Sequence, residues 1–290
     1  MFDNIFAAIE KWMRELLTGM VESNMSTMFT DVNEKTSEIA AQVGRTPQNW
    51  NSSVFSMIQN LSGSVVVPIA GIIITLVLCY ELISMLTERN NLHDVDTWMF
   101  FKYFVKAWVA IYLVSNTFTI TMAVFDVGQS VVNSASGIIN GETAIDVSSL
   151  SMQMQAAMAT MEIGELVVLA LETFLVSFCM KIMSVVITVI VYGRMIEIYL
   201  YTSLAPIPFA TMSNREWGHV GTNYFRGLFA LAFQAFLMMV CVAIYAALIS
   251  SVRISSNMHS ALIGVAAYTV ILCFSLMKTG SLSKQIFGSH

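Results

Sequence analysis

Long apolar runs dominate the pattern of hydrophobic and polar positions along the chain. A transmembrane helix needs roughly 20 mostly apolar residues. Four runs meet this requirement, at residues 65–85, 104–127, 228–252 and 258–277. The pattern therefore predicts an all-α polytopic membrane protein.

A fifth apolar run, residues 166–212, is too long for a single span. As one continuous helix it would extend about 70 Å, more than two hydrocarbon thicknesses. A glycine and two charged residues coincide at residues 192–197, so we predict a turn there. The run then divides into a long span, residues 162–192, and a broken segment, residues 194–212.

Two prolines, Pro206 and Pro208 in the string LAPIPF, mark the broken segment. Proline removes a backbone donor and breaks a helix, and Pro206 also biases Ala205 away from the helical region. The carbonyls freed one turn earlier need partners, which Thr202, Ser203 or neighbouring helices can supply. Because lipid does not tolerate an open backbone, we expect a re-entrant or half-span segment enclosed by other helices or by a subunit.

Lys and Arg residues beside the spans predict the orientation. The loop between the first two spans carries Arg89 and Lys102, whereas residues 128–161 contain no Lys or Arg. Short loops rich in Lys and Arg stay in the cytoplasm. If residues 194–212 dip in and return, the chain crosses the cell membrane five times, with its N-terminus outside and its C-terminus in the cytoplasm. If they cross fully, it has six spans.

The N-terminal region, residues 1–64, is predicted to lie outside, before a transmembrane domain of residues 65–290. Its first helix places apolar residues, among them Trp12, at amphipathic spacing. This apolar face could rest on lipid, on the protein's own surface or on a neighbouring subunit. Acids equal or exceed bases on the polar face, which favours protein over anionic lipid. Residues 30–53 are interpreted as a polar linker.

A second amphipathic stretch lies in the predicted external loop. Leu150, Met154, Met158 and Met161 fall on one face of a helix. Such a methionine stripe packs into a core or forms an adaptable surface for partners.

Composition supports a membrane location and narrows the function. Charged residues make up 11% of the 290 residues and hydrophobic residues 56%, against about 25% charged residues in a soluble domain. The net charge of −5 argues against a dedicated nucleic-acid-binding surface. The cysteines have no paired spacing and are expected to pack as small hydrophobic residues. They are Cys79, Cys179, Cys241 and Cys273.

The sequence contains no catalytic constellation. Its four histidines lack the spacing of a zinc site, and there is no phosphate loop, dinucleotide fingerprint or nucleophile elbow. We therefore predict that the protein is not an enzyme and that it has no catalytic residue, cofactor or metal.

Ionisable residues inside the spans are better functional candidates, because they are costly in lipid unless paired or hydrated. Glu172 and Lys181 point to opposite faces of the predicted helix, so they cannot pair with each other. Lys181 needs a carboxylate from another helix or subunit, or trapped water, and Glu81 and Asp126 lie at a suitable depth. Glu172 either has such a partner or lies at the outer headgroups.

Arg194 and Glu197 stand three residues apart, which predicts a local ion pair of structural importance at the inner surface. The candidate site residues are therefore Pro206, Pro208, Lys181, Glu172, Arg194, Glu197 and Trp12.

Three strings resemble the TrbL-type conjugal transfer proteins, in the form found in conjugative elements of Gram-positive bacteria. They are VIVYGRMIEIYLYTSLAPIPFATM, REWGHVGTNYFRGLFALAFQAF and LMKTGSLSKQIFGSH. The resemblance covers about residues 60–290. It implies a polytopic membrane component of a type IV secretion system that forms a channel or scaffold for DNA transfer. It also implies a homo-oligomer with other channel subunits, powered by separate ATPases. Because the proline segment needs enclosure, we predict that it lies at a helix or subunit junction near the translocation axis.

One departure from the family concerns the external loop, which is linked in the family to contact with the transferred DNA–protein complex. Here the loop carries Glu142 and Asp146 and no base, so it would repel phosphate. A packing role suits it better. Two alternatives stay open: a small-solute transporter with a discontinuous helix, although no internal repeat is present, and a purely structural membrane anchor.

Overall fold

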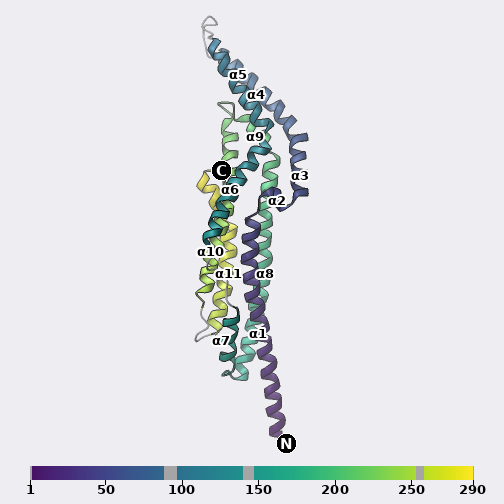
Figure 1. Cartoon of the computed structure of the whole chain (residues 1–290), viewed down its shortest axis with the longest axis vertical. Coiled ribbons are helices and arrows are strands. Elements are labelled where there is room, and N and C mark those ends of the chain that lie inside the picture. The colour runs from purple at the N-terminus through teal and green to yellow at the C-terminus, as the bar shows by residue number, and fades with distance from the viewer. Residues whose placement is uncertain (1, 88–96, 140–146, 253–257, 290) are drawn as a thin grey trace. The chain divides into compact units, whose positions relative to one another are not determined.

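The computed structural model describes residues 2–87, 97–139, 147–252 and 258–289, and the regular elements of these residues are helices (Figure 1). In chain order they are α1 (Phe2–Val43), α2 (Pro47–Trp50), α3 (Ser52–Leu61), a π-helical turn (Ser62–Val66), α4 (Val67–Thr87), α5 (Thr97–Ser115), α6 (Thr117–Ile139), α7 (Val147–Met158), α8 (Ile163–Ser203), α9 (Pro206–Thr211), α10 (Gly218–Ser250) and α11 (Met258–Phe287).

Five stretches within the described residues are long and apolar enough to cross a membrane. They are Ser52–Thr87, Trp98–Ser115, Ile163–Ser203, Gly218–Ser250 and Met258–Phe287. The prediction of an all-α polytopic membrane protein is therefore confirmed.

The second predicted span, residues 104–127, is divided at Asn116 into α5 and α6. The side chain of Asn116 donates to the Tyr112 carbonyl (2.9 Å), and the Thr117 hydroxyl donates to the Leu113 carbonyl (2.8 Å). Both side chains thus compete for carbonyls that the helix uses, which disturbs its regularity at this point.

Helix α8 runs without interruption from Ile163 to Ser203, so the turn predicted at residues 192–197 is wrong. A glycine such as Gly193 costs only about 1 kcal/mol in a helix interior, which is too little to end a long helix. The helix ends at Ser203, shortly before Pro206, which has no backbone N–H to donate. With 41 residues, α8 extends about 60 Å, so part of it lies beyond a hydrocarbon core of about 30 Å.

Helix α1 extends to Val43, so residues 30–43 of the predicted linker are helical. Val32, Ile39 and Val43 are buried, and their burial stabilises a helix that the many polar residues had obscured. The chain leaves the helix only at Gly44, shortly before Pro47 begins α2.

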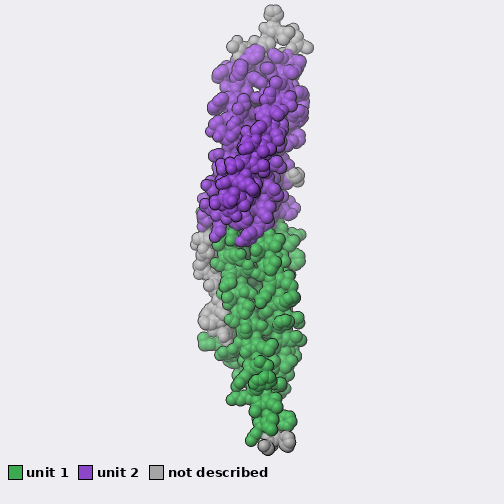
Figure 2. Space-filling model, turned by 90° about the vertical axis from the view of Figure 1, so that its right-hand side faces the viewer, with its two compact units in different colours: residues 1–43, 134–191, 238–278 green, residues 44–133, 192–237, 279–290 purple. Residues whose placement is uncertain are grey.

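Two compact units make up the chain, each assembled from distant parts of the sequence (Figure 2). Unit 1 contains Met1–Val43, Ser134–Val191 and Met238–Lys278. Unit 2 contains Gly44–Asn133, Tyr192–Leu237 and Thr279–His290. Residues 1–43 thus share a unit with parts of α8, α10 and α11.

Candidate functional site

The proline break in unit 2 lies between the end of α8 at Ser203 and the start of α9 at Pro206. Pro206 occupies the start of α9, where its missing donor is not needed. Ala205 nevertheless keeps helical dihedrals (φ −50°, ψ −39°), so the predicted bias away from the helical region is wrong. Its amide donates to the Thr202 carbonyl (3.3 Å), which tightens the turn and frees the carbonyl of Tyr201.

A pair of tyrosines from α8 and α10 closes the gap that the break leaves. The Tyr224 hydroxyl donates to the freed Tyr201 carbonyl (2.7 Å), and the Tyr201 hydroxyl donates to the Tyr224 carbonyl (3.2 Å). Their rings stack with centroids 4.4 Å apart. The hydroxyls of Thr202 and Ser203 bond back to carbonyls of the preceding turn instead. The partner for the open backbone therefore comes from a neighbouring helix.

Two glycines of α10 allow this close approach. A Cβ atom at Gly227 would lie 2.1 Å from the Tyr201 hydroxyl oxygen, and one at Gly221 would lie 2.5 Å from the Pro208 carbonyl oxygen. Sequence reasoning missed these residues and the tyrosine pair. The glycines of GHVGTNYFRG, six residues apart and beside a tyrosine, were the available signal.

The proline segment packs on one side against other helices of unit 2. Helix α9 packs against both α4 and α5, with Phe209 and Ala210 buried. The side chains that surround them are Ala70, Ile74 and Leu78 of α4 and Ala110 and Val114 of α5. Leu204, at the break itself, is exposed. The broken backbone is thus covered by protein on the side of α4, α5 and α10.

Arg194 and Glu197 interact electrostatically, but the direct ion-pair contact that we predicted is absent from the described part of the chain. Arg194 is only 7% exposed and donates from Nη2 to the Leu231 carbonyl of α10 (3.3 Å). Glu197 pairs instead with Lys284 of α11, at 3.0 Å. Arg194 turns into the helix interface, whereas the half-exposed Glu197 meets an ammonium group from another helix.

The other charged candidates have separate outcomes. Glu172 pairs with His259 of α11 within unit 1. Glu81, predicted as a partner of Lys181, pairs with Lys106 instead, because α4 and α5 lie together in unit 2. Asp126 and Lys181 are exposed on α6 and α8, respectively.

In unit 1, the polar helix α1 lies alongside the apolar helix α8, and the two helices run in the same direction. Hydrogen bonds at rising residue numbers define this register: Arg14 to the Met161 carbonyl (2.8 Å), Ser177 to the Asn24 carbonyl (3.2 Å) and Lys35 to Thr188 (3.1 Å). Met154 and Met158 of α7, which contacts α1, are buried, so the methionine stripe serves packing there. Leu150 and the acids Glu142 and Asp146 lie outside the described side chains.

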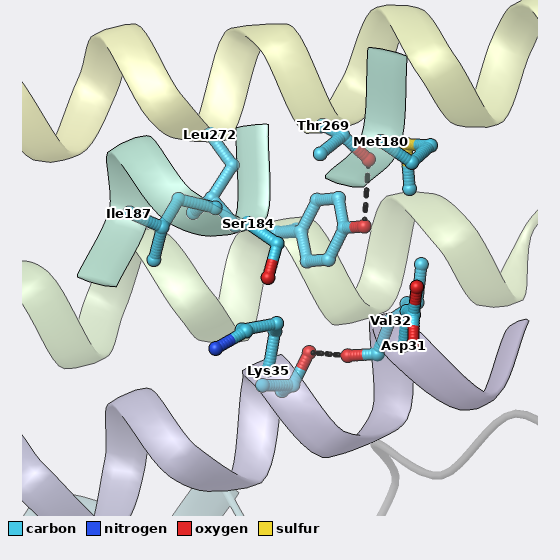
Figure 3. A pocket seen from close by; sticks show the side chains of 10 residues that line it. Asp31, Val32, Lys35, Met180, Ser184, Ile187, Thr269 and Leu272 are labelled. Atoms are coloured by element: carbon cyan, nitrogen blue, oxygen red, sulfur yellow. Dashed lines mark hydrogen bonds between the residues drawn. The ribbon is translucent and has the colours of Figure 1, made fainter. Parts of the chain in front are cut away.

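A small cavity lies where α1 meets α8, α10 and α11 (Figure 3). Asp31 and Lys35 of α1 and Ser184 of α8 line it, together with Thr269 of α11, which is bonded to Tyr245 of α10 (2.8 Å). Its volume of about 20 Å³ offers room for about one water molecule. Thr269 is near the middle of the apolar run 258–277, so charged residues of α1 lie level with the centre of a membrane span.

The N-terminal half of α1 differs from the half beside α8 in the exposure of its apolar side chains. Its apolar face is exposed on the chain, with Trp12 61% exposed, so it does not pack on the protein's own surface. The exposed apolar residues are Ile5, Phe6, Ile9, Trp12, Leu16 and Met20. Lipid and a neighbouring subunit remain as the surfaces that this face fits.

Comparison with known proteins identifies the family. A model of the family described as TrbL/VirB6 plasmid conjugal transfer like protein matches residues 32–206. No curated protein and no solved structure matches the chain. The match extends from the second half of α1 to the proline break, which is more than half of the 290 residues. Two of the three strings that resemble the family, REWGHVGTNYFRGLFALAFQAF and LMKTGSLSKQIFGSH, lie beyond the matched residues. This chain belongs to the TrbL/VirB6-like family of plasmid conjugal transfer proteins.

Proposed function

We propose that this membrane protein is a channel or scaffold subunit of a conjugative type IV secretion apparatus. In this role it helps form the translocation path for single-stranded DNA and its bound protein. The family match carries the proposal. Helix α1 also supports the proposal. This polar helix lies beside the middle of apolar helices of unit 1. A simple lipid anchor has no use for charged residues at that depth.

The proposed role is structural and not enzymatic. Homo-oligomers of the chain assemble with other channel subunits, and separate ATPases provide the energy. The exposed face around Trp12 is suited to contact a neighbouring subunit. Lys181, exposed on α8, meets a carboxylate of another subunit or water. The proline segment lies near the translocation axis, where Pro206 and Pro208 keep α8 from continuing.

The proposed orientation has the N-terminus outside and the C-terminus in the cytoplasm, and labelling of single cysteines tests it. A membrane-impermeant maleimide added to intact cells should label Thr160→Cys, which is exposed just before α8. It should not label His219→Cys, exposed at the start of α10, until the membrane is opened. External labelling of both positions would show that residues 194–212 cross the membrane fully after α8, which gives six spans.

Replacing both prolines by alanine tests the role of the break. The change removes a helix penalty of about 3 kcal/mol per proline, so α8 should continue and deprive Tyr224 of the Tyr201 carbonyl. We expect normal membrane insertion and a strong loss of DNA transfer in a mating assay with a strain lacking the native chain. Leu204→Ala, an exposed neighbour, is the matched control and should transfer normally. Normal transfer by the double variant would contradict the role assigned to the break.

Substitution of Trp12→Asp tests the subunit contact proposed for the N-terminal half of α1. A charge on this face should weaken assembly, measured as the apparent mass of the complex in nanodiscs, while the chain still inserts. Glu15→Ala, on the polar side of the same segment, should leave the mass unchanged. If Trp12→Asp assembles and supports transfer normally, the face has no role in assembly.

A further inference from the structure

Helix α1 has an exposed polar face between residues 21 and 43. The exposed side chains are Ser23, Ser26, Thr27, Thr30, Glu34, Ser37 and Ala41. They recur at the spacing of one helix face and include no large apolar residue. The opposite face, with Val21, Met25, Met28 and Val32, is buried.

This face lies at the level of membrane-spanning segments of the same unit. The contacts of Asn24 with Ser177 and of Lys35 with Thr188 place it along the middle of α8. The cavity shared by Asp31 and Thr269 places it at the level of the middle of α11 (Figure 3). Two independent neighbours therefore give the same depth.

The other exposed faces at this level are apolar. Phe174, Phe178 and Val185 of α8 are each more than half exposed, and so are Ile271 and Phe274 of α11. Residues of this kind are suited to lipid tails. Unit 1 thus presents two different surfaces at one depth, and they cannot both face the same solvent.

Hydrocarbon is unsuitable for the polar face chiefly because of its carboxylate. A hydroxyl can bond back to its own helix, as Thr27 does to the Ser23 carbonyl (2.8 Å). The exposed Glu34 can only accept hydrogen bonds and has no such solution. Lys35, one residue further, already pairs with Glu38 and bonds to Thr188. The carboxylate of Glu34 therefore calls for water.

We infer that the exposed polar face of α1, residues 23–37, borders a water-filled passage within the thickness of the membrane, in place of the expectation that all of residues 1–64 lie outside it. The small hydroxyl side chains leave room for water beside Glu34. The inference that water fills it is argued from the contacts of unit 1 and does not depend on the proposed function. That DNA or its bound protein moves through it rests on the proposed function.

Cysteine reactivity in membranes tests the inference. The four native cysteines are first replaced by serine or alanine, and Ser23, Thr30 and Ser37 are then changed to cysteine one at a time. A charged methanethiosulfonate reagent reacts with thiolates in water, so each position should be modified in native membranes. Phe174→Cys and Val185→Cys, at the same depth on α8, should remain unmodified there. All five should react after denaturation, which shows that each cysteine is present and intact.

Two results would overturn the inference. Positions on the polar face that react only after denaturation would show that protein covers the face, as a polar helix of a second subunit would. Equal reactivity on α1 and α8 would show that the two faces have the same surroundings.

A transfer assay separates this inference from the proposed function. Modification of Thr30→Cys with a bulky reagent should reduce DNA transfer, and the same treatment of cells carrying Phe174→Cys should not. If Thr30→Cys is modified in membranes but transfer is unchanged, the face is hydrated yet lies outside the DNA path. That outcome contradicts the channel role and leaves the water-filled passage intact.

Discussion

Hydrocarbon gives a polar group no partner, so every backbone or charged group at membrane depth must be satisfied by protein or by water. Two features of this chain depend on that constraint. At the proline break, the freed Tyr201 carbonyl receives the hydroxyl of Tyr224 from α10. In unit 1, the polar groups of α1 bond to α8 and leave one polar face outward. In both places a neighbouring helix makes an otherwise costly segment tolerable.

The break and the polar helix meet this constraint differently. Around the break, the Gly221 and Gly227 positions let α10 approach closely, and α4 and α5 cover α9, so protein covers the open backbone on that side. Around α1, the contacts cover only one side, and Glu34 stays exposed. A break whose freed carbonyl has a partner is consistent with a fixed structural joint, whereas a partly uncovered polar helix is what a conduit needs.

The membrane fold could be predicted from sequence because long apolar runs are a strong signal, and each candidate span overlaps a predicted one, although the second is Trp98–Ser115 and not residues 104–127. The ends of the helices inside these runs could not be predicted from sequence. Gly193 and Arg194 resembled a turn, yet a buried contact with Leu231 keeps Arg194 inside a continuous helix. Composition likewise made residues 30–43 resemble a linker, because the pattern cannot show that Val32 and Ile39 are buried against other helices.

The candidate site was predictable only in part. Pro206 and Pro208 identified the break because proline acts locally. The partners of Glu197, Glu172 and Glu81 are all on helices distant in sequence, and spacing along one helix gives no information on them. The polar face of α1 was not predicted, because residues 30–53 were interpreted as a linker, and its meaning comes from the depth at which α8 holds it.

The central claim is that α1 lies parallel to α8 at membrane depth, and disulfide cross-linking in native membranes measures this most directly. Asn24→Cys and Ser177→Cys should form a disulfide under mild oxidation, because the Ser177 hydroxyl contacts the Asn24 carbonyl at 3.2 Å. Asn24→Cys with Thr188→Cys is the control, since Thr188 lies about 16 Å further along α8. The account predicts cross-linking of the first pair alone. No cross-link in the first pair, with both cysteines reactive after denaturation, would contradict it.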